Sequence, residues 1–193
     1  MAGVHGDEPE GYQFIERFMR DGKWHELEGM AALWVIPRVN PDACVAGTRT
    51  NSRGVDLNRN MPTKDWQPVG PQDRYNPGVS AGSELENQIL IRFIEELQPH
   101  AILSFHSWEP CVNYNGPSKL LAEIIAKENG YRVTDHIGYP TPGSFGEWAG
   151  TEHNIPTITL EIAEGSSDDE TWKTHHEAIL AGLLFAAVND KLG

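Results

Sequence analysis

The stretch Ser83–Phe105, SELENQILIRFIEELQPHAILSF, passes from the spacing of an amphipathic helix to a short apolar run. Ser83 and Glu86 have the spacing of a capping box, which predicts a helix that runs to about Gln98. The residues expected to face the core are Leu85, Ile89, Phe93 and Leu97. Ala101–Phe105 follows as an expected strand. A helix that leads at once into a buried strand is typical of an α/β domain.

The same alternation continues on both sides of this stretch. Further helices are expected at Pro9–Met19, Lys119–Asn129 and Thr171–Lys191, and further strands at Ala31–Pro37 and Thr157–Ile162. Ala31–Pro37, AALWVIP, is a continuous apolar run, which predicts a strand buried on both faces. Arg38–Ala81 has no clear period, and long segments of this kind are usually functional. Because no repeat or second pattern interrupts the chain, we expect one domain.

Composition excludes several classes of function. The 193 residues carry a formal net charge of −13, which argues against general binding to nucleic acids or anionic membranes, since both need a basic face. The longest apolar stretch, Ile179–Val188, has about half the length of a membrane span. Cys44 and Cys111 cannot form a disulfide framework, and Met1–His5 lacks the pattern of a signal peptide. We therefore expect a cytoplasmic protein.

Three residues have the chemistry of metal ligands. His5 and Glu8 stand three residues apart at an expected strand-to-helix turn, and His106 directly follows the strand Ala101–Phe105. Two histidines and one glutamate leave a position open for water, as in catalytic rather than structural zinc sites. A lone HxxE also arises by chance, and a histidine at a strand end is often only packed. The combination is what favours a metal site.

The segment Arg38–Tyr75 is locally basic in an acidic chain, with six basic and four acidic residues. It contains Arg49, Asn58 and Arg59. A guanidinium group matches a carboxylate with two parallel hydrogen bonds and also stabilises an oxyanion. The alternative is a surface loop whose arginines pair with its own aspartates.

Glu161 and Tyr139 are two further candidates. Glu161 lies inside the otherwise apolar strand Thr157–Ile162, where a carboxylate is costly to bury without a partner. This position indicates either a site residue or a buried ion pair. Tyr139 lies in the segment Gly138–Ser144, which is rich in Gly and Pro, and it could equally be a packing or turn residue.

Taken together, these residues resemble the zinc carboxypeptidase family. The motifs HxxE, NPD, an arginine loop, DLNRN, HSW and TLE occur in one order over nearly the whole chain. The resemblance implies a single catalytic domain over residues 1–193 with a mixed β-sheet flanked by helices. It implies one Zn²⁺ per chain, bound by His5, Glu8 and His106. It also implies that Arg49 polarises the scissile carbonyl and that Glu161 is the general base.

The resemblance also assigns substrate-binding residues. Asn58 and Arg59 correspond to the pair that grips the terminal carboxylate of the substrate, and Tyr139 corresponds to a mobile capping tyrosine. Gly146 stands at the position expected to line the pocket for the departing residue. The substrate is therefore expected to be a small peptide with a free carboxylate, whereas the sequence leaves the oligomeric state open.

Within the family, Val55–Asn60 and Gly138–Gly146 look most like the bacterial murein peptide amidase branch. Those enzymes cleave the γ-D-glutamyl–meso-diaminopimelate bond of cell-wall peptides. Family members usually have more sheet before the HxxE turn than this chain supplies, so the resemblance also predicts a shortened N-terminal part.

Two alternatives are consistent with much of the same pattern. One is a zinc-dependent deacylase of N-acyl amino acids, similar to aspartoacylase and succinylglutamate desuccinylase, which share an HxxE-like turn and a DLNR-like segment. The other is a non-catalytic module that binds carboxylates. The surroundings of Trp108 and Tyr139 favour the peptidase over the deacylase, and Glu161 favours an enzyme because binding alone does not require it.

Overall fold

A four-stranded mixed sheet forms the centre of the computed structural model, which describes residues 1–189. Its strands are β1 (Ile102–Trp108), β2 (Cys111–Asn115), β3 (Arg132–Thr134) and β4 (Thr157–Ala163). The order is β1-β4-β2-β3, with β1 parallel to β4, β4 antiparallel to β2, and β2 parallel to β3. The strands predicted at Ala101–Phe105 and Thr157–Ile162 are β1 and β4, whereas β2 and β3 were not predicted.

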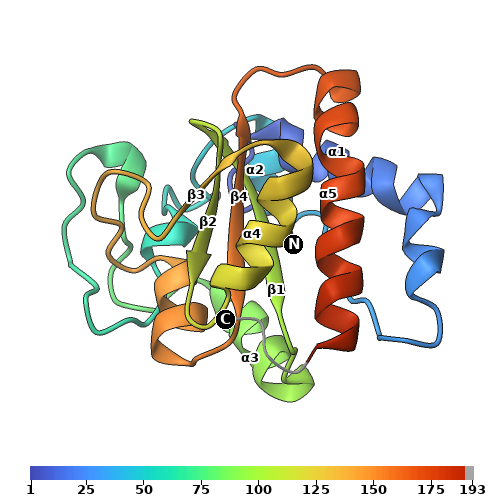
Figure 1. Ribbon diagram of the computed structural model, residues 1–193. Helices are drawn as coiled ribbons and strands as arrows, with labels where there is room; N and C mark the ends of the chain where they lie inside the picture. The colour runs from blue at the N-terminus through green and yellow to red at the C-terminus, as the bar shows by residue number, and fades with distance from the viewer. Residues whose placement is uncertain (190–193) are drawn as a thin grey trace.

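Helices flank the sheet, as predicted. The longer ones are α1 (Pro9–Asp21), α3 (Leu85–Leu97), α4 (Lys119–Asn129) and α5 (Asp168–Val188). The short ones are η1 (Lys23–Leu27), α2 (Pro41–Ala46), η2 (Leu57–Arg59), η3 (Asp73–Tyr75) and the π-helical turn η4 (Glu147–Glu152). Figure 1 shows α4 and α5 together in front of the sheet, with α3 below it. The last two residues of the predicted closing helix, 190 and 191, lie outside the described residues.

Side chains of strand β4 alternate between the apolar core and the opposite face of the sheet. Ile158, Leu160 and Ile162 are buried in one apolar cluster with side chains of α1, α4 and α5. Because side chains alternate along a strand, Glu161 points to the other face. The carboxylate therefore avoids the main core although it is buried.

The predicted strand Ala31–Pro37 is wrong, because the structure contains no strand at these positions. Trp34 is 60% exposed, and this segment has no paired ladder. A single backbone hydrogen bond, from the Ala2 amide to the Ile36 carbonyl at 3.0 Å, joins it to the first residues. An apolar run becomes a buried strand only when a neighbouring backbone pairs along its length.

The start of α3 also differs from the prediction. Glu84, rather than Ser83, occupies the N-cap position, and no side chain caps the helix. The Ser83 hydroxyl instead donates a hydrogen bond of 2.7 Å to the Glu84 carboxylate. The predicted capping box with Glu86 is therefore wrong, since a local partner competes for the serine.

The face of α3 that packs inward is rotated from the predicted one. Leu85 and Ile89 are 65% and 59% exposed, whereas Leu90 and Ile94 are buried. The Asn87 side chain is buried as well and donates to the backbone carbonyl of Leu57, the first residue of η2, at 2.9 Å. This tertiary contact decides the orientation of a helix that has apolar residues on several sides.

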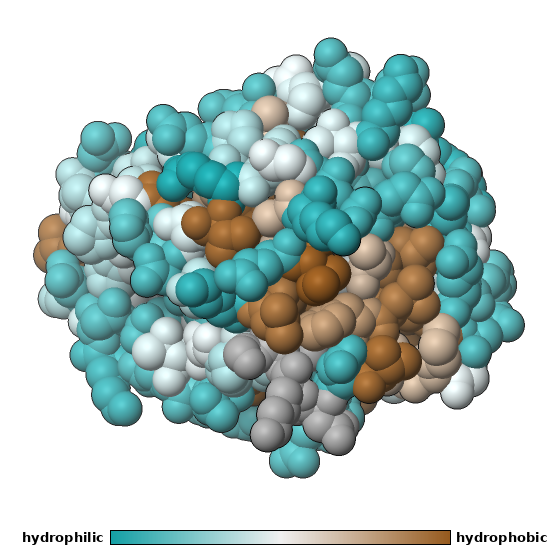
Figure 2. All heavy atoms as spheres, viewed as in Figure 1, coloured by the Kyte–Doolittle hydropathy of each residue, from teal (hydrophilic) through white to brown (hydrophobic). Residues whose placement is uncertain are grey.

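A large apolar groove of about 520 Å³ borders β1, α5 and the segment around Trp34. Met1, Phe93, Leu97 and Leu183 are among its lining residues, and it contains none of the predicted site residues. Figure 2 shows hydrophobic side chains gathered on the face where α5 lies. None of the helices in residues 1–189 combines the length and the hydrophobicity that crossing a membrane requires.

Candidate metal centre and substrate pocket

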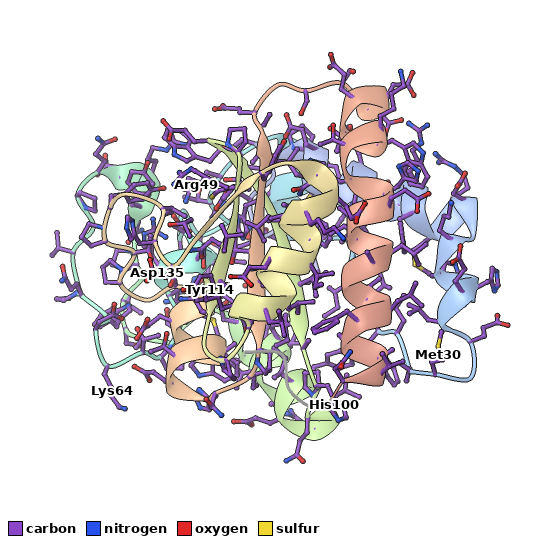
Figure 3. All side chains as sticks on the ribbon, in the orientation of Figure 1. Met30, Arg49, Lys64, His100, Tyr114 and Asp135 are labelled. Carbon is purple, nitrogen blue, oxygen red and sulfur yellow. The ribbon has the colours of Figure 1, made fainter. Side chains whose placement is uncertain are left out.

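The candidate site lies where β1 and β4 end. These strands are parallel neighbours, and their register places His106 directly beside Glu161. Residues paired in this way point to the same face of a sheet. Arg49 lies near the same edge of the sheet (Figure 3). The topology thus brings together residues that are far apart in the sequence.

The turn that carries His5 and Glu8 is anchored by backbone hydrogen bonds of the preceding residues to β1 and to the start of α2. The Phe105 amide donates to the Met1 carbonyl at 3.0 Å, and the Asn40 amide donates to the Gly3 carbonyl at 2.8 Å. Gly6 passes so close to α2 that an added Cβ would lie 1.9 Å from the Ala43 carbonyl oxygen. The motif therefore needs glycine at this position for steric reasons.

His5, Glu8 and His106 form a cluster in which one ligand atom from each lies within 4.8 Å of the others. His5 Nδ1 lies 2.7 Å from Glu8 Oε1, and His106 Nδ1 lies 2.9 Å from Glu8 Oε2. Two imidazole nitrogens and a carboxylate are the donor set of a catalytic zinc site. The side chains present therefore fit a zinc ion by donor type and by convergence.

Asp56, which was not among the predicted site residues, supports this cluster. His5 Nε2 donates to Asp56 Oδ1 at 3.0 Å, and Arg49 Nε donates to Asp56 Oδ2 at 2.9 Å. Asp56 is fully buried. A carboxylate on one imidazole nitrogen fixes the ring so that the other nitrogen faces the metal. The sequence contains a signal for this role, because Asp56 is the first residue of the DLNRN motif and stands two residues before Asn58.

The buried charges of the cluster stabilise one another. Burial alone would lower the pKa of His5, but the carboxylates of Glu8 and Asp56 raise it to about 9. Burial would raise the pKa of Glu8, yet the charges of His5 and His106 bring it well below its usual value. Burial would also raise the pKa of Asp56, whereas His5 and Arg49 lower it. The carboxylates are therefore ionised and available as ligands or supports.

Glu161 behaves differently from these carboxylates. It is 6% exposed, and burial raises its pKa above 4.5, with the Glu8 charge acting in the same direction. A carboxylate with a raised pKa holds a proton more readily, which suits a general base that must later return that proton.

Replacing Asp56 by Asn is expected to weaken metal binding by roughly 10–100-fold, because the His5 ring loses its charged partner. Competition with a chelator would measure this change. Asp42→Asn, at an exposed position in the NPD motif, is the matched control and should leave affinity unchanged. Equal affinities for Asp56→Asn and the unmodified protein would contradict the supporting role of Asp56.

A small cavity of about 90 Å³ opens beside the cluster. The predicted site residues that line it are His5, Glu8, Arg49, Asn58, Arg59, His106, Tyr139 and Glu161. Arg59 is 5% exposed, and among the described residues it has no carboxylate within ion-pair distance. Its Nη1 donates to the Asn58 carbonyl at 2.7 Å. The Asn58 side-chain oxygen accepts from the Phe145 amide at 2.8 Å, which leaves its amide nitrogen for other partners.

Of the two remaining predicted site residues, Tyr139 lines the cavity and Gly146 does not. Tyr139 is 41% exposed at the cavity, and burial raises the pKa of its hydroxyl above 10. Gly146 is not among the residues that line the cavity, and a Cβ there would lie 2.4 Å from Asn115 Oδ1. Its part in substrate binding stays a prediction. Arg74 and Tyr75, which were not among the predicted site residues, also line the cavity.

Comparison with known proteins gives consistent results. The model of the zinc carboxypeptidase family matches residues 2–181. Murein peptide amidase A of Escherichia coli (strain K12) is 34% identical over 184 residues, which cover 90% of this chain and 74% of that protein. Murein peptide amidase A of Vibrio campbellii (strain ATCC BAA-1116) is 34% identical over 195 residues, covering 95% of this chain and 75% of that protein.

Solved structures agree with the sequence relatives. The crystal structure of murein-tripeptide amidase MpaA from Escherichia coli O157 superimposes with a TM-score of 0.76 at 32% identity, covering 95% of this chain and 78% of that one. Bovine thrombin-activatable fibrinolysis inhibitor also reaches a TM-score of 0.76, at 18% identity, over 97% of this chain and 80% of that one. The second likeness concerns the fold alone.

Proposed function

The chain belongs to the zinc carboxypeptidase family and is a hydrolase, and from this we propose that it cleaves murein peptides between γ-D-glutamate and meso-diaminopimelate. The family implies zinc, and we propose one ion per chain, held by His5, Glu8 and His106. The names of the relatives, which include a murein-tripeptide amidase, support this choice of substrate.

The observation that carries the proposal is the meeting of three kinds of group in one cavity. Metal donors, a buried carboxylate with a raised pKa and an arginine without a carboxylate partner all line it. A metal-binding site alone does not need Glu161, and a carboxylate-binding site alone does not need the metal donors. Hydrolysis of an amide next to a free carboxylate uses all three.

Arg59 binds the carboxylate of the departing residue. Its guanidinium is buried at the cavity, and none of the described carboxylates lies within ion-pair distance of it, so a substrate carboxylate supplies the missing partner. The Asn58 amide nitrogen adds a second donor, because its oxygen is occupied by the Phe145 amide. Tyr139, which lines the cavity and is 41% exposed, contacts the bound substrate from the wall of the cavity.

Arg49 and Glu161 act on the reacting bond. Zinc, when bound, supplies Lewis-acid chemistry that polarises a carbonyl and makes water more acidic. Glu161 takes a proton from the attacking water and delivers it to the departing nitrogen. Arg49 is held rigidly by Asp56 and Glu8, at 2.9 and 3.1 Å, and stabilises the oxyanion that develops on the carbonyl.

Turnover of L-Ala-γ-D-Glu-meso-diaminopimelate by the zinc-loaded protein tests the proposal. We expect release of meso-diaminopimelate, about one zinc per chain by metal analysis, and loss of activity after chelation that added zinc restores. An N-acyl amino acid serves as the comparison substrate. Hydrolysis of that compound in preference to the tripeptide would favour the deacylase, and no turnover of either would discard the proposed activity.

A further inference from the structure

Tyr75 is surrounded by guanidinium groups at the cavity. The guanidinium carbons of Arg49, Arg59 and Arg74 lie 4.9, 5.4 and 5.4 Å from the centre of its ring. All four residues line the candidate site. An aromatic ring attracts cations to its face and restricts their movement, so Tyr75 gathers positive charge at this cavity.

The three arginines differ in what they already bind. Arg49 is paired with Asp56 and Glu8, and Arg59 donates to a backbone carbonyl. The side chain of Arg74 is 54% exposed, and its ion pair within the described residues joins Nη2 to Asp7 Oδ2 at 3.6 Å. That separation exceeds the length of a direct charged hydrogen bond. Arg74 therefore keeps its donors largely free.

We propose that Arg74, positioned over Tyr75, binds a second carboxylate of the substrate, separate from the one that Arg59 holds. The inference rests on the proposed function and identifies a further determinant of its specificity. Arg59 is 5% exposed whereas the side chain of Arg74 is 54% exposed, so the two guanidinium groups lie at different depths of the cavity and can hold separate carboxylates. A γ-linked glutamate keeps its α-carboxylate, and meso-diaminopimelate carries a carboxylate at each end, so murein peptides supply a second anionic group.

Asp7 competes for Arg74. It stands between His5 and Glu8 in the sequence, and it supplies the only negative charge within 4.0 Å of Arg74 among the described residues. A substrate carboxylate that approaches Arg74 meets this acid and is repelled by it. Removal of the Asp7 charge is therefore expected to strengthen the binding of the second carboxylate.

Binding measurements on the zinc-loaded Glu161→Gln protein test the subsite without turnover. Calorimetry would compare three ligands: L-Ala-γ-D-Glu-meso-diaminopimelate, its analogue with the glutamate α-carboxylate amidated, and its analogue with L-Lys in place of meso-diaminopimelate. In this background, Arg74→Gln should raise the Kd of the tripeptide about tenfold. The loss should vanish for the one analogue that lacks the carboxylate bound by Arg74, and that analogue identifies its source.

Matched variants separate this effect from a general one. Arg53→Gln is the control, because Arg53 is a similarly exposed arginine paired with Glu84 outside the cavity, and it should leave all three affinities unchanged. Arg74→Lys should recover part of the loss, and Asp7→Asn should tighten tripeptide binding. Equal weakening of all three ligands by Arg74→Gln, or no weakening, would overturn the subsite. Absence of turnover by the zinc-loaded wild type, with Arg74-dependent binding retained, would discard the proposed reaction and leave the subsite standing.

Discussion

Replacing Glu161 by Gln is expected to lower kcat about a thousandfold while the protein keeps its zinc. The amide has nearly the same shape as the carboxylate but cannot take a proton from water. Glu161 is 6% exposed on β4 and lies beside His106 in register, so no solvent-borne base can easily replace it. Single-turnover kinetics with the murein tripeptide, together with metal analysis, would measure both parts of this result.

The pH profile gives a second measure of the same residue. Burial raises the pKa of Glu161 above 4.5, and activity requires the ionised form, so kcat/KM should fall as pH drops through that raised pKa. The residual activity of the Gln variant should not show this fall of kcat/KM at low pH. Glu109→Gln, at an exposed position between β1 and β2, is the control and should retain full turnover. Undiminished activity in Glu161→Gln would remove this residue from the role of base.

Replacing Arg49 by Lys is expected to lower kcat by roughly 100–1,000-fold with little change in KM. Lysine keeps the positive charge beside Asp56 and Glu8, so the zinc ligands should stay in place. It lacks the planar fork that Arg49 uses to hold these acids and to face the cavity at the same time. An interaction made only in the transition state appears in kcat, which steady-state kinetics on the tripeptide would show.

Arg59→Lys provides the contrast for Arg49. Arg59 is proposed to hold a carboxylate that is charged both before and during the reaction, so its replacement should act mainly by raising KM. Amidation of the departing residue's α-carboxylate should remove the difference between Arg59→Lys and the unmodified protein. If Arg49→Lys instead raised KM and left kcat unchanged, Arg49 would belong to substrate binding rather than to the stabilisation of the oxyanion.

Much of the fold could be predicted from local patterns, and the failures have specific physical causes. Helix α1 runs two residues beyond the predicted Pro9–Met19 and ends at Asp21, where Gly22 caps it in the left-handed conformation with φ of 77°. Strands β2 (CVNYN) and β3 (RVT) were missed because they are short and mix polar with apolar residues, so neither contains an apolar run. The segment Ala31–Pro37 was mistaken for a strand because its apolar residues line a groove without a paired backbone.

The site was more predictable than the elements around it. His5, Glu8 and His106 could be predicted because few residue types bind zinc, and these types stand at fixed positions in a motif. Tyr75 and Arg74 could not, because their roles depend on how η3 folds against other loops of an aperiodic segment. Such contacts leave no period in the sequence.

The residues of this site stand on two kinds of structure, paired strands and short helical turns. His106 and Glu161 stand on paired strands, where a shift of one residue would turn both side chains to the wrong face. Arg59 and Arg74 stand on short turns, η2 and η3, in a long segment that connects α2 with α3. Loops tolerate insertion and exchange far better than sheet interiors do. Descendants of this chain could therefore acquire new substrates by altering the part of this segment around η3, while Arg49 and Asp56, which lie earlier in the same segment, are kept with the hydrolytic centre.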